Sequence, residues 1–188
     1  MQAASLADVA AALSMEALKG TIRAFDPRYH SIKAHKEQAQ TARDIKAMLH
    51  DSQLIAENID YRLQDAYSLR SIPQVHGASK RFIEHARENI ENEIHSSGDN
   101  PVIYPIDDGD GIAISGANFD GTYIGMSADS LCVALANLAK IAERRIDRMV
   151  NSHFSEMPAF LVRNPGLNSG YMLSLIHISE PTRPLYIS

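Results

Sequence analysis

The sequence has little cysteine, no long uninterrupted apolar run and no large excess of charge of one sign. Cys132 is the only cysteine, so no disulfide bond can form within the chain, which fits a reducing compartment. No apolar run approaches the roughly 20 residues that a membrane-spanning helix needs. No Lys or Arg precedes Lys19, so the N-terminal stretch lacks the basic region of a signal peptide. We therefore expect a soluble protein of the cytoplasm that contacts no membrane.

The charge and size of the chain narrow the class of protein further. The formal net charge is −5, and the basic residues Arg144, Arg145 and Arg148 are offset by Glu143 and Asp147. Because no basic patch is evident, binding to nucleic acid is not expected. With 188 residues, of which 45% are hydrophobic and 22% charged, the chain is long enough for one globular domain and too short for two large ones.

The sequence also lacks the spacings that are typical of metal sites. It contains 8 histidines, but no pair has the HExxH or His/Cys spacing of a zinc site. The acidic stretch 107–111 lacks the ligand at the twelfth position of a calcium loop, so a hairpin turn explains it better. Cys132 falls within an expected helix, where packing is its expected role. We expect no bound metal.

Helical periodicity predicts most of the fold. Apolar residues recur at helical spacing over 6–18, with Gly20 at the expected C-cap, and again over 35–49. Between them, Pro27 and the loss of the apolar period predict a connection without helix. Ser71 and Gln74 form a capping-box pattern that opens a third helix, which ends near His95.

The second half of the chain predicts a hairpin and one long helix. Residues 102–115 contain two short β-prone runs across an Asp/Gly turn. The apolar repeat from about Asp120 to Val150 predicts a helix about 45 Å long, which would pack against other long helices in a bundle or an oligomer. We expect an all-α fold over residues 1–172, built as a bundle of long helices with one small β-hairpin.

The end of the chain does not share this pattern. Residues 173–188 contain Pro181 and Pro184 and show no helical period. They resemble the translation of a sequencing adapter at the end of a gene fragment, and we expect a non-native tail. A genuine proline-rich tail is the alternative.

The stretch 63–77, "LQDAYSLRSIPQVHG", interleaves polar side chains with apolar ones. A solvated helix would separate them onto two faces. If the stretch were helical, Gln64, Tyr67 and Arg70 would span about 120° of its surface. Such a polar face either lines a cavity or makes capping and surface hydrogen bonds, and the spacing alone leaves both interpretations open.

This stretch resembles the Gln-Asp-x-Tyr-Ser-x-Arg segment of the histidine and aromatic amino-acid ammonia-lyases. Further stretches match the family in the same order: "SMEALKGTIRAFDPRYH", "SGDNPVIY", "SGANFDGTYIG", and "ERRIDRMVN" followed by "NPGLNSGYM". The resemblance covers most of residues 1–172. It implies the long-helix fold shared with fumarase and aspartase, and a homotetramer whose active sites draw on three subunits.

The resemblance also implies site residues. In the family, an Arg matching Arg70 binds the substrate carboxylate, and a Tyr matching Tyr67 lies beside the prosthetic group and the amino group. Gln64 matches a Gln that hydrogen-bonds in the same pocket. Phe119 matches an aromatic residue near the prosthetic group. Asn118, and also Asn100, are candidates by their positions in their motifs.

The prosthetic group of this family is methylidene-imidazolone (MIO), which forms from an Ala-Ser-Gly tripeptide. That tripeptide is absent from the sequence, and the nearest string, Ala78-Ser79-Lys80, has the wrong third residue. The family carries its tripeptide upstream of the matching region. We therefore expect an interior fragment of a longer enzyme, inactive when alone.

The substrate is less sharply indicated. Histidine is favoured, which would give urocanate and ammonia, so the parent would be a carbon–nitrogen lyase of histidine catabolism. Several departures from the family pattern keep alternatives open. His95 stands where the family commonly has Asn, and Ser71 stands where Cys is frequent. The stretch "GTYIG" stands where many histidine-specific members have Glu-Pro. A phenylalanine or tyrosine ammonia-lyase or an aminomutase is one alternative. A non-catalytic helical assembly module is the other.

Overall fold

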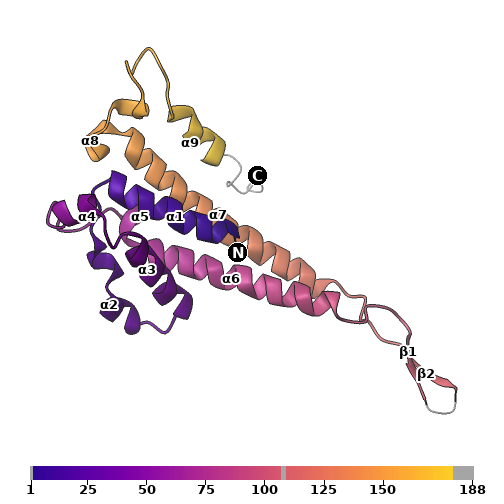
Figure 1. Cartoon of the computed structure of the whole chain (residues 1–188). Helices are drawn as coiled ribbons and strands as arrows, with labels where there is room; N and C mark the ends of the chain where they lie inside the picture. Colours follow the sequence, from indigo (N-terminus) through magenta and orange to yellow (C-terminus); the bar gives the residue numbers. More distant parts are fainter. Residues whose placement is uncertain (1, 107–108, 180–188) are drawn as a thin grey trace. The chain divides into compact units, whose positions relative to one another are not determined.

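The computed structural model describes residues 2–106 and 109–179 and is mainly helical (Figure 1). The chain divides into two compact units: the first comprises residues 1–81 and 134–188, and the second residues 82–133. The boundaries between the units fall inside two long helices, α6 (Ile72–Ile94) and α7 (Thr122–Val150). The predicted all-α class with one hairpin is confirmed.

The first unit begins with short and medium helices that precede α6: α1 (Gln2–Ala17), η1 (Ile22–Phe25), α2 (Pro27–Ser31), α3 (Lys36–Met48), α4 (Gln53–Glu57) and α5 (Tyr67–Arg70). After α7 it continues with α8 (Ser152–Ser155), η2 (Ala159–Leu161) and α9 (Met172–Ser179). Helix α1 contacts α3, α4 and α5, while α2 and η1 contact α3.

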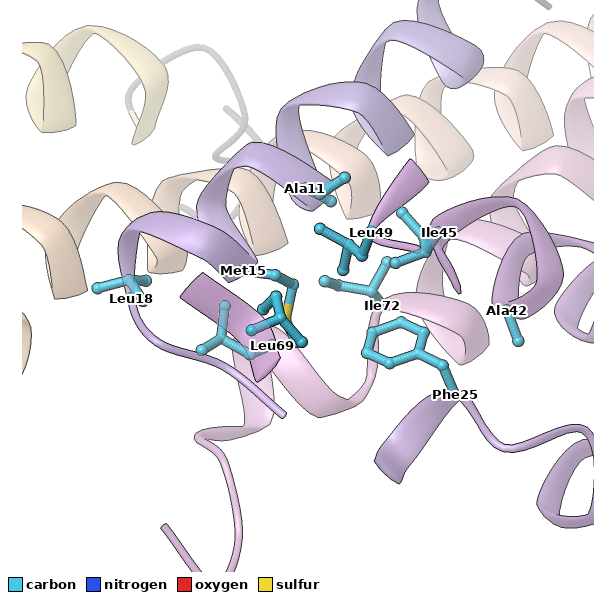
Figure 2. Packing of buried hydrophobic residues seen from close by; sticks show 11 residues of the cluster. Ala11, Met15, Leu18, Phe25, Ala42, Ile45, Leu49, Leu69 and Ile72 are labelled. Carbon is cyan, nitrogen blue, oxygen red and sulfur yellow. The ribbon is translucent and has the colours of Figure 1, made fainter. Parts of the chain in front are cut away.

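The core of the first unit lies among these helices (Figure 2). Met15, Phe25 and Leu69 are fully buried in it, as is Ile72 at the start of α6. Each such side chain stabilises the fold by about 1.5–3 kcal/mol through the apolar area it removes from water. The remaining members of the cluster are Ala11, Ala12, Leu18, Ala42, Ile45, Leu49 and Ile55. The core therefore fixes α5 and the start of α6 against α1.

Helix α1 ends in a Schellman motif, with the left-handed position one residue earlier than predicted. Lys19, not Gly20, has the positive φ of 52°, and the Gly20 N–H donates to the Met15 carbonyl at 2.8 Å. A Cβ on Gly20 would lie 2.6 Å from Met15 Cε, so a larger residue there would require the end of the Met15 side chain to shift.

The predicted connection after Gly20 is wrong, since η1 and α2 form there. Pro27 does not prevent a helix but begins α2, at a position where a missing N–H leaves no hydrogen bond unmade. The Asp26 carboxylate caps this helix by accepting from the Arg28 N–H at 2.8 Å. His30 is the buried residue of α2, and its Nε2 lies 2.9 Å from the Ala24 carbonyl oxygen.

The predicted capping box at Ser71 is also wrong. The Ser71 hydroxyl donates to the Tyr67 carbonyl at 2.6 Å, and so serves the end of α5 and not the start of α6. Gln74 instead has a buried Oε1 without a partner among the described residues. Farther along α6, a Cβ on Gly77 would lie 2.5 Å from the Gln38 Cα, so this glycine lets α6 approach α3 closely.

A buried polar cluster joins α1, α3 and α6 within the first unit. The Asp8 carboxylate accepts from His76 Nδ1 at 2.7 Å and from Lys80 Nζ. Lys80 also donates to Thr41 Oγ1 at 2.9 Å. Asp8 and His76 are 2% and 0% exposed, so these bonds are shielded from water. Paired burial of this kind is what allows a carboxylate to lie inside a core.

The second unit contains the predicted hairpin. Strands β1 (Val102–Pro105) and β2 (Gly111–Ile114) pair antiparallel, with Ile103 opposite Ala113. Asn100 Oδ1 accepts from the Gly116 N–H at 2.7 Å and closes the base of the hairpin.

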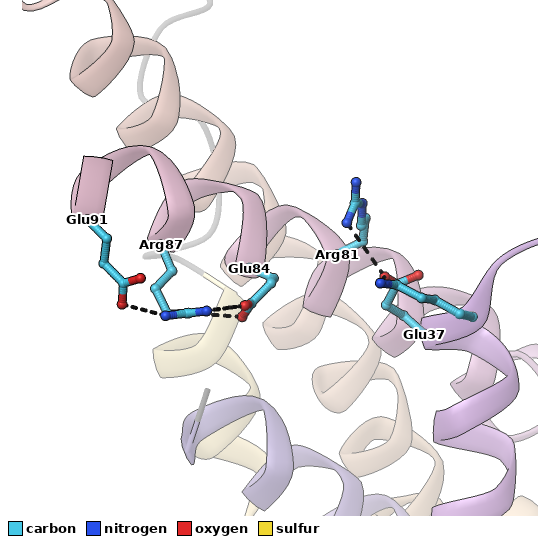
Figure 3. A network of polar contacts seen from close by, with 6 residues as sticks. Glu37, Arg81, Glu84, Arg87 and Glu91 are labelled. Carbon is cyan, nitrogen blue, oxygen red and sulfur yellow. Dashed lines mark hydrogen bonds and ion pairs between the residues drawn. The ribbon is translucent and has the colours of Figure 1, made fainter. Parts of the chain in front are cut away.

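Helices α6 and α7 are tied together within the second unit. Asn89 Nδ2 donates to Ser127 Oγ at 2.9 Å. On the surface of α6, Arg87 forms ion pairs with Glu84 and Glu91 (Figure 3). Such exposed pairs contribute only about 0.3–0.5 kcal/mol each.

Helix α7 corrects two expectations. It contains an 18-residue window of mean hydropathy 1.3, so by length and composition it is apolar enough to cross a membrane, contrary to the sequence-based expectation. Long core helices of globular proteins pass the same criterion, which makes this weak support for a membrane span. Cys132 on this helix is exposed and does not have the packing role that was expected.

The first part of the expected tail is helical. Helix α9 covers Met172–Ser179, so the absence of helical order predicted for 173–188 is wrong there. Residues 180–188, with Pro181 and Pro184, lie outside the described residues. That the stretch is a non-native tail stays a prediction.

Candidate functional site

A pocket of about 510 Å³ lies in the first unit beside α5. Its volume is within the range of about 300–1,000 Å³ that is usual for small-molecule sites. It is lined by Thr21, Arg23, Ala24, Tyr29, Leu63, Gln64, Asp65, Tyr67, Arg70, Ser71 and Gln74. The predicted catalytic residues Gln64, Tyr67 and Arg70 are therefore brought together on one pocket.

The local structure explains how polar and apolar residues alternate here. Tyr67 and Arg70 are the first and last residues of α5, and both side chains are exposed. Leu69, between them, is fully buried in the core and holds this short helix in place. Gln64 lies outside any helix, so the expected span of 120° does not apply to it. Gln64 reaches the pocket from the non-helical segment 58–66.

Arg70 is the cation best placed to bind a carboxylate. Within residues 2–106 and 109–179 its side chain makes no hydrogen bond or ion pair. The other arginine on the pocket, Arg23, is already bound to Asp60 at 2.5 Å. A free guanidinium can grip a carboxylate with two parallel hydrogen bonds.

Sequence reasoning missed several residues of this pocket. Thr21, Arg23 and Tyr29 come from the η1–α2 region, which was expected to be a plain connection. They fall in "SMEALKGTIRAFDPRYH", one of the stretches that carry the family resemblance. Polar and aromatic side chains in that stretch were the available signal.

Asp65 was also missed, and it is the most deeply buried acidic group at the pocket. It is 4% exposed, and its Oδ2 accepts from the Thr21 N–H at 2.6 Å. Its Oδ1 is buried without a hydrogen-bond partner among the described residues. Burial raises the pKa of Asp65, and the Thr21 N–H and the charge of Arg62 oppose this rise without cancelling it.

A second pocket, of about 460 Å³, shares Tyr67 and is bordered by the basic side chains of α7. Two of these cations already have partners: Arg144 forms ion pairs with acidic neighbours on its own helix, and the Arg148 guanidinium lies 4.8 Å from the centre of the Phe154 ring. Lys140 is the third cation at this pocket, and Arg70 differs from it because Arg70 lines the same pocket as Gln64.

The predicted cofactor-binding residues Asn118 and Phe119 belong to the second unit, in the turn that precedes α7. Phe119 is 64% exposed, and neither residue lines the pocket of the first unit. Asn100 has the structural role at the hairpin described above. The cofactor-binding role of Asn118 and Phe119 stays a prediction.

The residues of the pocket suit a zwitterionic amino acid. Arg70 supplies a fixed positive charge for a carboxylate, and the Tyr67 phenol and the Gln64 amide supply groups that donate and accept hydrogen bonds. Among the described residues, no group of three or more His, Cys, Asp or Glu gathers where it could hold a metal ion.

Known proteins share this sequence and fold. The family described as aromatic amino acid lyase matches residues 1–182. The chain is 44% identical to the histidine ammonia-lyase of Clostridium tetani over 89% of this chain and 32% of the relative. It is 46% identical to that of Alkaliphilus metalliredigens over 90% of this chain and 33% of the relative.

Solved structures agree. Histidine ammonia-lyase from Trypanosoma cruzi superposes with a TM-score of 0.83 at 40% identity, over 95% of this chain and 32% of that one. Tyrosine aminomutase from Streptomyces globisporus superposes with a TM-score of 0.84 at 32% identity, over 95% of this chain and 38% of that one. This chain spans about a third of the length of these relatives, and it belongs to the aromatic amino acid lyase family.

Proposed function

We propose that this chain is part of an ammonia-lyase that eliminates ammonia from L-histidine and releases urocanate. The observation that carries the proposal is that Gln64, Tyr67 and Arg70, the residues that match the family's substrate-binding segment, line one pocket together. The identity of 44–46% to histidine ammonia-lyases supports histidine as the substrate.

Each side chain has a distinct task in this proposal. Arg70 binds the substrate carboxylate, which fixes the amino acid relative to the reacting bonds. Tyr67, which is 68% exposed, lines the pocket, and its phenol would exchange a proton with the amino group or the β-carbon of a bound amino acid. Gln64 hydrogen-bonds in the same pocket and limits the orientations that a bound amino acid can take.

The electrophile of the family does not fit the residues of this chain alone. Ser79 of the nearest string is 2% exposed in the interior of α6, and Lys80 is bound to Asp8, so this string is not arranged to cyclise. We propose that MIO forms in polypeptide outside these 188 residues, where it supplies the electrophile that activates the amino group. Assembly as a homotetramer and a cytoplasmic location complete the proposal.

An aminomutase is the second candidate, because the tyrosine aminomutase structure superposes as well as the lyase does. A phenylalanine or tyrosine ammonia-lyase would use the same carboxylate clamp. These candidates differ in product: urocanate for the histidine enzyme, an unsaturated aromatic acid for the other lyases, and a β-amino acid for an aminomutase.

A hybrid enzyme tests the proposal. In it, residues 1–172 of this chain replace the matched segment of the Clostridium tetani histidine ammonia-lyase. Ultraviolet absorbance and chromatography would follow product formation from L-histidine, L-phenylalanine and L-tyrosine. We expect urocanate from histidine. Turnover of an aromatic substrate without urocanate would contradict the histidine assignment, and turnover by the isolated 188-residue chain would contradict the external electrophile.

A further inference from the structure

We propose that Asp65 is a positioning residue of the pocket, which holds segment 58–66 against the turn at Gly20 and Thr21 and so fixes Gln64 and Tyr67. This inference deepens the proposed function and rests on it for the roles of Gln64 and Tyr67. Asp65 acts through its neighbours and not on the substrate.

Segment 58–66 depends on such contacts because it has no helix or strand of its own. Arg62 and Asp65 anchor it on either side of Gln64. Arg62 Nη1 donates to the Leu18 carbonyl at 2.8 Å, and Asp65 accepts from the Thr21 N–H at 2.6 Å. Both bonds end on the same turn after α1, so they confine the short span that contains Gln64.

The turn is shaped to receive the Asp65 carboxylate. A Cβ on Gly20 would lie 3.3 Å from Asp65 Oδ2, so a larger residue would crowd the carboxylate. Thr21 is also the N-cap of η1, where its Oγ1 accepts from the Arg23 N–H at 3.4 Å. The contact between Asp65 and Thr21 therefore joins two segments that are distant in the sequence and that both line the pocket.

The environment of Asp65 favours a functional over a purely structural role. Burying this side chain with one oxygen unpartnered lowers stability, so stabilisation of the fold does not by itself account for Asp65. Such groups are retained disproportionately at functional sites. These contacts lie inside the first unit and do not depend on the rest of the parent enzyme.

Kinetics of the hybrid enzyme test the inference through two variants. Asp65→Leu removes the acceptor, and we expect kcat to fall about tenfold or more because the pocket groups lose their alignment. KM should change less than about threefold, since Arg70 still binds the carboxylate. Asp65→Asn keeps an acceptor for the Thr21 N–H and should restore kcat to within about threefold of the unmutated hybrid.

Thr41→Val is the matched control, because it removes one partly buried hydrogen bond at a residue that does not line the pocket. It should leave kcat unchanged. An Asp65→Leu hybrid with full kcat would overturn the inference. So would an Asp65→Asn hybrid as slow as Asp65→Leu, which would indicate that the charge itself takes part in the reaction.

Amide hydrogen exchange in the 188-residue chain tests the anchor without any assay of activity. In the unmutated chain the Thr21 amide should exchange slowly. In Asp65→Leu its exchange rate should rise at least tenfold, and in Asp65→Asn the rate should return to the slow value. If the exchange rate of the Thr21 amide did not change in the Asp65→Leu chain, the proposed anchoring contact would be wrong. This result does not depend on whether the Asp65→Leu hybrid enzyme assembles. If the unmutated hybrid used an aromatic amino acid instead of histidine, the proposed function would fail, while the same variants measured on that substrate would still decide the role of Asp65.

Discussion

Asp8 and Asp65 are both buried carboxylates of the first unit, at 2% and 4% exposure, yet their surroundings are opposite. Burial alone raises the pKa of Asp8, but hydrogen bonds from His76 and Lys80 outweigh it and leave the pKa lowered. Burial raises the pKa of Asp65, and its fewer partners do not reverse the change. One carboxylate is stabilised by its partners, and the other is destabilised by its site.

The difference indicates what each carboxylate does. Asp8 joins three helices inside the core, where the pairing of both its carboxylate oxygens stabilises the fold. Asp65 lies between Gln64 and Tyr67 in the sequence at the candidate site, where one unpartnered oxygen lowers stability while the other holds the Thr21 N–H. Proteins commonly concede stability at functional sites in this way. Variants of the two regions should therefore separate loss of stability from loss of activity.

The largest expected effect is at Asp8. Asp8→Ala leaves Lys80 and His76 buried without their acceptor, and should lower the free energy of unfolding by about 3–5 kcal/mol. Urea unfolding of the 188-residue chain, followed by circular dichroism, measures this change. Asp51→Ala, which removes an exposed partner of His50, is the control and should change it by less than about 1 kcal/mol. If Asp8→Ala lowered the free energy of unfolding by less than about 1 kcal/mol, Asp8 would not differ from Asp65 in stabilising the fold.

Arg70 should show the reverse pattern. Arg70→Gln in the hybrid enzyme removes the carboxylate clamp, and kcat/KM for histidine should fall about 100-fold or more. The free energy of unfolding should change by no more than about 0.5 kcal/mol, because the side chain is exposed. Steady-state kinetics and urea unfolding give the two numbers. Arg81→Gln, an exposed arginine 3.8 Å from Glu37 (Figure 3), is the control and should retain activity.

The dependence of stability on pH should reflect His76. Burial lowers the pKa of His76 more than the hydrogen bond to Asp8 raises it, with Arg145 and Lys80 adding to the lowering. The unfolded chain therefore binds the proton more tightly, so the stability of the folded chain is complete above about pH 6.5. It should fall by up to about 1.4 kcal/mol for each pH unit below that value, until the folded pKa is passed.

Urea unfolding between pH 8 and pH 5 measures this slope, and His76→Gln should flatten it. At still lower pH the Asp8 contribution is lost as well, because its folded pKa lies below the usual value. The pKa of Asp65 is raised in the folded chain, opposite to that of Asp8, so protonation of Asp65 favours the folded chain. A stability that does not change between pH 6.5 and pH 5 would contradict a buried neutral His76.

The smallest expected effect is the most specific one. Asp65→Asn removes a poorly stabilised charge and keeps an acceptor for Thr21, so the free energy of unfolding at neutral pH should stay level or rise by about 0.5 kcal/mol. Asp8→Asn should lower it, because Lys80 loses a charged acceptor. Parallel urea titrations compare the two isosteric variants. Equal losses would show that both carboxylates stabilise the fold in the same way.

The long elements could be predicted from the sequence, whereas the short ones could not. Helices α3, α6 and α7 lie within a few residues of their predicted bounds, because an apolar repeat over three or more turns has one favourable solution. A helix such as α2, with 5 residues, is too short to show a period. Its signal is Asp26 as a cap followed by Pro27 at the first helical position, a pattern in which proline begins a helix and does not break one.

The candidate site was predicted only where one continuous segment carries it. Gln64, Tyr67 and Arg70 follow from a single motif and line one pocket. Asp65 and Thr21 are 44 residues apart, and their contact is formed only when segment 58–66 folds onto the turn after α1. No local spacing records such a contact, so the sequence could not identify it.

The lone thiol on α7 offers a practical use. Because Cys132 is exposed and no other cysteine occurs in the chain, a maleimide dye would mark one defined point of the second unit without any engineered mutation. The rate of labelling of the 188-residue chain would report directly how accessible that face of the helix is to solvent.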